Sequence, residues 1–85
     1  MHETHLIQPI IKGISDHAKK EGATAVTKVC LKLGALTGIK EDSFRETFTL
    51  LAKGTMLQDA KLEITFFPGT RLEVVSFDID EKDGR

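Results

Sequence analysis

The sequence has 85 residues, of which 40% are hydrophobic and 29% are charged, and this composition indicates one small globular domain. Twelve lysines and arginines oppose 13 aspartates and glutamates, so the formal net charge of −1 argues against a nucleic-acid or membrane-surface binder. No apolar run reaches the roughly 20 residues of a membrane span, and the first residues lack a signal peptide's basic start, so we expect a cytoplasmic protein. The single cysteine, Cys30, excludes an internal disulfide and a four-thiolate zinc site.

The first predicted element is an amphipathic helix over residues 4–20. Lys19 and Lys20 suit the negative end of its dipole, and Gly22 suits the left-handed position that follows a helix. The helix is inferred from apolar residues that recur at spacings of three and four, namely Leu6, Ile7, Ile10, Ile11, Ile14 and Ala18.

Pro9 leaves the start of this helix open. Proline cannot donate a backbone hydrogen bond, although the donors of a first turn have no helical partner in any case. Either the helix begins near Thr4, or it begins at Pro9 after an extended arm. The choice determines how far His2 and His5 lie from the folded body.

Residues 25–33 alternate in polarity and predict a half-buried strand. Thr27, Val29, Leu31 and Leu33 form its inner face, and Lys28, Cys30 and Lys32 its solvated face. The two lysines would lower the pKa of the Cys30 thiol and favour reactivity, but no neighbouring histidine or acid supports this, so we favour an inert cysteine. The glycines of residues 34–38 then indicate a loop.

A second helix is predicted to start around residues 41–43 and to end near Gly54. Ser43 and Glu46 match the capping box of a helix start. The helical spacing is carried by Phe44, Phe48, Leu51 and Ala52.

Two further strands follow, over residues 61–67 and 71–80. Pro68-Gly69 between them has the composition of a type II turn, with Gly69 at positive φ. The apolar phase of the last strand slips at Val74-Val75, which indicates a bulge.

The element order is helix, strand, helix, strand, strand. We expect an α+β fold in which two helices pack on one face of a small three-stranded mixed sheet. The strand-helix-strand unit should make a parallel crossover, and the Pro-Gly turn should pair the last two strands antiparallel, while the strand order stays open. Residues 1–80 form the single expected domain, and 81–85 form a charged, frayed tail.

Candidate metal ligands gather at the N-terminus. The Met1 amine, the His2 amide nitrogen and the His2 imidazole can close consecutive chelate rings around one ion, a nitrogen-rich planar set that suits Cu(II) or Ni(II). Another amide, His5 or a nearby side chain would complete it, and binding would release protons. We interpret His17 as a solvated side chain.

Several segments in register resemble the HypA/HybF family, the nickel metallochaperones of [NiFe]-hydrogenase maturation and, in some organisms, of urease. They are Met1-His2-Glu3, residues 19–23, 31–39, 52–55 and 60–64, and the closing strand 72–79. The resemblance implies a nickel site at Met1, His2 and Glu3. In some members an acidic residue beside the second helix also touches the metal; the corresponding position here is Lys40, followed by Glu41 and Asp42.

This sequence departs from the family pattern at one place. Family members insert two Cys-x-x-Cys pairs where this sequence has Pro68-Gly69-Thr70. We therefore expect no structural zinc.

Our leading hypothesis is a non-enzymatic accessory protein that holds Ni(II) and passes it to a partner, by resemblance a hydrogenase-maturation GTPase or the hydrogenase large subunit. The alternative is a metal-free interaction module that uses the open sheet face or edges. The oligomeric state stays open between a monomer and a homodimer formed through the sheet edges or a swapped first helix.

Overall fold

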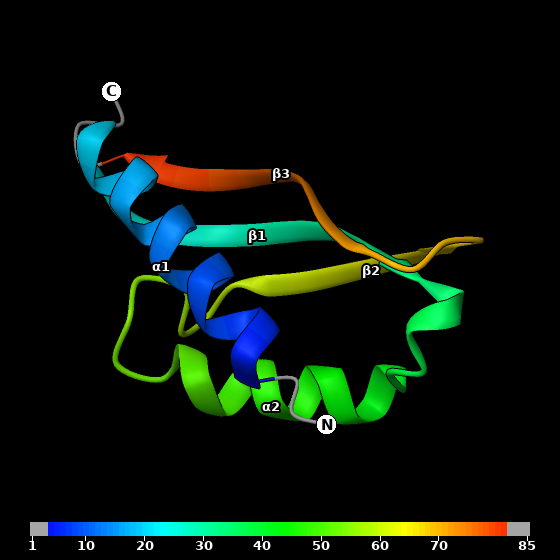
Figure 1. The fold of residues 1–85 in the computed structure, drawn as a ribbon. Coiled ribbons are helices and arrows are strands. Elements are labelled where there is room, and N and C mark those ends of the chain that lie inside the picture. The colour runs from blue at the N-terminus through cyan, green and yellow to red at the C-terminus, as the bar shows by residue number, and fades with distance from the viewer. Residues whose placement is uncertain (1–3, 82–85) are drawn as a thin grey trace.

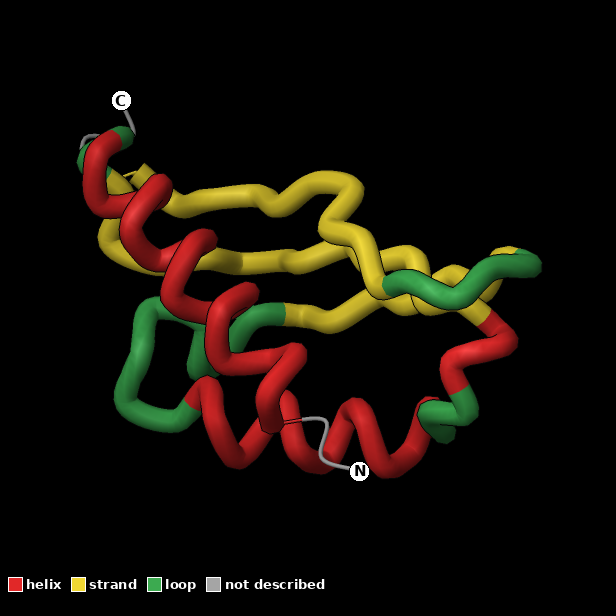
Figure 2. Tube along the Cα trace, in the orientation of Figure 1, coloured by secondary structure: helices red, strands yellow, loops and turns green. Residues whose placement is uncertain are grey.

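The computed structural model describes residues 4–81. Its elements are α1 (Thr4–Lys20), β1 (Ala23–Gly34), a short 3-10 helix η1 (Ala35–Thr37), α2 (Glu41–Ala52), β2 (Lys61–Phe67) and β3 (Leu72–Glu81). The three strands form one sheet in the order β2-β1-β3. Figures 1 and 2 show α1 crossing the sheet, with one end beside α2 and the other beside the end of β3. The expected α+β class and element order are confirmed.

Helix α1 has the bounds that its apolar spacing predicts. Its buried residues are Ile7, Ile11, Ile14 and Ala18, and Pro9 lies within the helix. The helix therefore begins at Thr4 and not at Pro9, because burial of Ile7 stabilises the turn that precedes the proline. At the other end Gly22 has a φ of 80°, as predicted for the residue that terminates the helix.

Strand β1 is the centre of the sheet and carries most of the buried strand residues. Val26 and Val29 are both buried, at 1% and 0% exposed, whereas Thr27 is exposed and donates its hydroxyl to the Asp78 carbonyl oxygen at 3.3 Å. The prediction that Thr27 belongs to the inner face is therefore wrong. The register shifts between Val26 and Lys28, and the extra residue changes the side-chain alternation.

Helix α2 begins at Glu41, two residues before the predicted capping residue. Its N-cap position is occupied by Lys40, which makes no side-chain capping hydrogen bond. The interpretation of Ser43 as the N-cap is wrong, because Ser43 lies within the first turn. Glu41 and Asp42 supply the negative charge that favours a helix start.

The connection from β2 to β3 differs from the predicted hairpin. Strand β1 pairs parallel with β2 and antiparallel with β3, so β2 and β3 lie on opposite sides of β1 and do not pair with each other. The chain crosses the end of β1, where the Leu36 N–H donates to the Gly69 carbonyl at 2.9 Å and the Gly34 N–H donates to the Arg71 carbonyl at 2.8 Å. Within residues 4–81 only Gly22, Gly38 and Gly54 have positive φ, so the predicted type II turn at Gly69 is also wrong.

The bulge predicted in the last strand is confirmed. Cys30 of β1 faces Ser76, and the next residue, Leu31, faces Val74, so Val75 is the extra residue. Lys61–Phe67 also matches the predicted range of the preceding strand.

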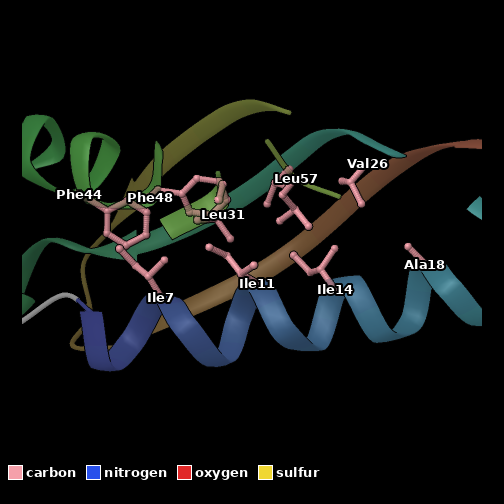
Figure 3. Close-up of a cluster of buried hydrophobic side chains, with 11 residues drawn as sticks. Ile7, Ile11, Ile14, Ala18, Val26, Leu31, Phe44, Phe48 and Leu57 are labelled. Carbon is pink, nitrogen blue, oxygen red and sulfur yellow. The ribbon is translucent and has the colours of Figure 1, made fainter. Parts of the chain in front are cut away.

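One apolar core joins both helices to the sheet. In Figure 3 Ile7 of α1 points toward Phe44 and Phe48 of α2, while Ile14 lies toward Leu57. The two phenylalanine rings stack with their centroids 6.4 Å apart. The core cluster consists of Ile7, Ile11, Ile14, Ala18, Val26, Val29, Leu31, Phe44, Phe48, Ala52 and Leu57. This packing holds the start of α1 against α2.

Candidate metal centre

The predicted metal ligands fall at the boundary of the described structure. Met1, His2 and Glu3 lie outside the described residues, directly before α1. His5 lies in the first turn of α1 and is exposed. Of the four predicted ligands the structure thus places one, His5, on a helix whose next turn is fixed by the buried Ile7.

Of the two acidic residues at the start of α2, Glu41 has a partner on the protein. The Arg45 Nε donates to the Glu41 carboxylate at 2.8 Å, and the Arg45 guanidinium also donates to the Leu62 carbonyl oxygen at 2.8 Å. Lys40, at the position where the resemblance implies an acidic ligand, is exposed. Arg45 competes with any cation for Glu41, and the exposed Asp42 is the nearest acidic residue in sequence that remains. Only the i,i+4 spacing of Glu41 and Arg45 could have indicated this pair from sequence.

Two further side chains of metal-binding type lie away from His5: Cys30 is in β1, and His17 is in the last turn of α1, at the opposite end of the helix from His5. The Cys30 Sγ is 3.7 Å from the Glu63 carboxylate, and His17 packs edge-on against Phe77 with ring centroids 5.6 Å apart. His17 Nε2 also lies 3.9 Å from the Glu21 carboxylate. Across residues 4–81 there is no group of three or more His, Cys, Asp or Glu side chains that could hold a metal ion.

The lysine side chains of β1 contact side chains of β2. The Lys28 ammonium lies 3.4 Å from the Glu63 carboxylate, and this contact raises the pKa of Lys28, with smaller contributions from Cys30 and Asp78. The Lys32 ammonium lies 5.2 Å from the centre of the Phe67 ring. The lysines that flank Cys30 in sequence are therefore engaged with other side chains, which supports the interpretation of Cys30 as inert.

A cleft lies between α1 and the loop that follows α2. It has a volume of about 640 Å³, and Lys12, Ser15, Lys19, Leu51 and Met56 are among its lining residues. Sequence reasoning did not predict it, because its two walls are far apart in the chain. His5, the one predicted metal ligand among the described residues, is not among its lining residues. None of the helices in the described part of the chain is both long and apolar enough to cross a membrane.

Comparisons with known proteins agree with this fold. The family model described as hydrogenase/urease nickel incorporation, metallochaperone, HypA matches residues 1–72. Hydrogenase maturation factor HypA 2 from Bradyrhizobium diazoefficiens is 39% identical over 70 residues, covering 82% of this chain and 62% of the relative. Hydrogenase maturation factor HybF from Salmonella typhimurium is 35% identical over 68 residues, covering 80% of this chain and 60% of the relative.

Solved structures share the fold at lower sequence identity. A solution structure of the Ni metallochaperone HypA from Helicobacter pylori has a TM-score of 0.82 and 16% identity, and the match covers 96% of this chain and 100% of that one. A second HypA solution structure has a TM-score of 0.80 and 18% identity, with 93% and 96% covered. The chain spans about 60% of the length of the curated relatives that it matches.

Proposed function

Because the chain belongs to the HypA family of hydrogenase/urease nickel-incorporation metallochaperones, we propose that it binds Ni(II) at its N-terminus and delivers the ion during maturation of a nickel enzyme, [NiFe]-hydrogenase. The observation that carries the proposal is the extent of the family match, which begins at residue 1 and so includes Met1, His2 and Glu3. The named relatives are hydrogenase maturation factors. The proposed partners are a maturation GTPase or the hydrogenase large subunit, and the proposed compartment is the cytoplasm.

The chemistry of the donor set suits nickel. The Met1 amine, the His2 amide nitrogen and the His2 imidazole form five- and six-membered chelate rings in one plane, and such nitrogen donors favour Ni(II) over the harder Mg²⁺ or Ca²⁺. Glu3 contributes its backbone or its carboxylate. His5, exposed in the first turn of α1, is the proposed additional ligand.

A terminal chelate also suits transfer of the ion. Consecutive residues that precede the first helix do not enclose a metal in a buried cage, so a partner's ligands can replace them one at a time. Binding requires the amine, the amide and the imidazole to lose their protons, and a lower pH therefore weakens it. The proposed role is delivery and not catalysis.

The test is a calorimetric Ni(II) titration of untagged protein that retains its native Met1. Stoichiometric binding should be lost in His2→Ala and in a form extended by residues before Met1, because each change removes one donor of the chelate. His17→Ala is the matched control, since His17 lies at the far end of the same helix beside Glu21. Zn(II) is the control metal.

The alternative function is that of a metal-free interaction module. If wild type, His2→Ala and the extended form all bind Ni(II) equally weakly, the terminal chelate does not exist and this alternative replaces nickel delivery. His5→Ala addresses the finer question: an intermediate loss of affinity, with unchanged stoichiometry, identifies His5 as the additional ligand.

A further inference from the structure

Strand β3 is an edge of the sheet whose outer side is unpaired within residues 4–81 (Figure 1). The carbonyls of Asp78 and Asp80 accept the hydroxyls of Thr27 and Thr24 from β1, at 3.3 and 3.0 Å, so these two carbonyls point toward β1. Successive carbonyls of a strand point in opposite directions, so that of Ile79 points to the free side. The edge therefore presents backbone groups that an additional strand can pair with.

The opposite edge of the sheet is different. The guanidinium of Arg45 reaches from α2 to the Leu62 carbonyl of β2 at 2.8 Å, and Glu41 holds that guanidinium in place at 2.8 Å. Helix α2 thus covers part of β2. Of the two edges, β3 is the more accessible to a partner.

A groove runs beside this edge, between β3 and α1. It has a volume of about 400 Å³ and is lined mainly by apolar atoms, from Pro9, Ile10, Gly13, Ile14, His17, Val74 and Phe77. Val74 remains 41% exposed although it lies on the face of the sheet that α1 crosses. An added strand directs every second side chain to this face, so its alternate residues would enter the groove.

The negative charge of β3 favours basic residues at those positions of the partner strand that do not face the groove. The strand contains four acidic residues and no lysine or arginine (Leu72–Glu81, sequence LEVVSFDIDE). Phe77 and Ile79 pack against the core, so Asp78 and Asp80 lie on the other, open face, and both are exposed. Basic side chains opposite them would form cross-strand ion pairs.

We propose that the free edge of β3 and its groove bind an extended segment of a partner protein in which aliphatic residues alternate with lysine or arginine. The aliphatic side chains occupy the groove, the basic ones face Asp78 and Asp80, and the backbone pairs with the edge. A second copy of this chain is disfavoured, because antiparallel pairing of β3 with itself about Val75 and Ser76 places Glu73 opposite Asp78. The inference does not depend on nickel binding.

The probe is an amidated hexapeptide of sequence Lys-Val-Lys-Ile-Lys-Val that carries fluorescein on its N-terminus, and binding is followed by fluorescence anisotropy and by the amide NMR signals of the protein. Binding should shift the signals of Phe77 and Ile79, and replacing the three lysines by glutamates should weaken it by about tenfold or more. The same hexapeptide with methylated amides on its pairing side should lose binding, because it retains charge and apolar area but not the backbone donors. Equal binding of the methylated peptide would overturn strand addition.

Two neighbouring valines give matched variants. Val74→Lys places a charge in the groove and should weaken binding by about tenfold, whereas Val75→Lys should change it by less than about threefold, because Val75 does not line the groove. Both residues are exposed, at 41% and 57%, so both variants should fold. Equal effects, or NMR shifts confined to β2, would contradict the proposal. Self-association that Val74→Lys abolishes would replace the partner segment by a second copy.

Discussion

The backbone of Gly69 passes so close to Gly34 that a Cβ atom on Gly34 would lie 2.4 Å from the Gly69 carbonyl oxygen and 2.9 Å from the Arg71 nitrogen. Gly34 has a φ of −67° and a ψ of 127°, which any residue can adopt, so only the close approach requires glycine here. The connection between β2 and β3 can cross the end of β1 because this side chain is absent.

Gly34→Ala should therefore destabilise the protein. The atoms in the way belong to the backbone, so the connection itself must move, and we expect the free energy of unfolding to fall by about 1 to 3 kcal/mol. Urea denaturation measures this. Gly13→Ala is the control, because no atom lies within 4 Å of its added Cβ and alanine favours the helix, so stability should rise by about 0.5 to 1 kcal/mol. A neutral Gly34→Ala would show that the connection is not packed on β1.

Replacement of Arg45 tests how α2 is attached to the sheet. Arg45→Met removes an ion pair within the helix and also a hydrogen bond to the Leu62 carbonyl, so the free energy of unfolding should fall by about 1 to 2 kcal/mol. Lys12→Met also removes an i,i+4 pair, with Asp16, but that pair is exposed and makes no such bond, so its effect should stay below about 0.5 kcal/mol. Equal losses in urea denaturation would mean that the Leu62 contact contributes nothing.

The pH dependence of stability should reveal the pair between Lys28 and Glu63. Glu63 raises the pKa of Lys28 in the folded protein above the ordinary value of 10.5, so the paired ammonium stabilises the fold fully below that pH. This stabilisation is lost as the pH rises through the folded pKa. In lysine-selective NMR titrations, Glu63→Gln should move the titration of Lys28 to lower pH, and Asp42→Asn should leave it in place. An unchanged Lys28 titration in Glu63→Gln would contradict the assignment.

Periodicity predicted the helices well because each helix buries one face against a single core. Ile7, Ile11, Ile14 and Ala18 recur at the spacing of one helical face, and each is buried in the structure. This pattern fixed the bounds of α1 and left open only the effect of Pro9. The packing of Ile7 against α2 settles that question, and it depends on residues about 40 positions away.

The errors in the sheet have one physical origin, which is that strand pairing is not local. Thr27 is displaced from the inner face by a register shift against β3, and Pro68-Gly69 is not a hairpin turn because Gly34 allows the chain to cross β1. Neither fact is visible in the alternation of polar and apolar residues. For the metal site, the sequence predicted the donors Met1, His2, Glu3 and His5, of which the structure describes only His5, whereas the engagement of Glu41 by Arg45 required the folded chain.

Nickel should change the stability of this protein very little. A ligand stabilises a fold only by binding the native state more tightly than the unfolded state, and a site formed by the native state alone adds about 2.7 kcal/mol at a ligand concentration 100 times Kd. Met1, His2 and Glu3 are consecutive, so the proposed chelate would form in the unfolded chain as well, while the side chains of the core cluster are all apolar. We expect Ni(II) at that concentration to raise the free energy of unfolding by less than about 0.5 kcal/mol, and EDTA to leave the urea midpoint unchanged.

A rise near the full value of about 2.7 kcal/mol would mean that the folded body supplies ligands. If so, His5→Ala and Asp42→Asn should identify the contributing side chain by reducing that rise.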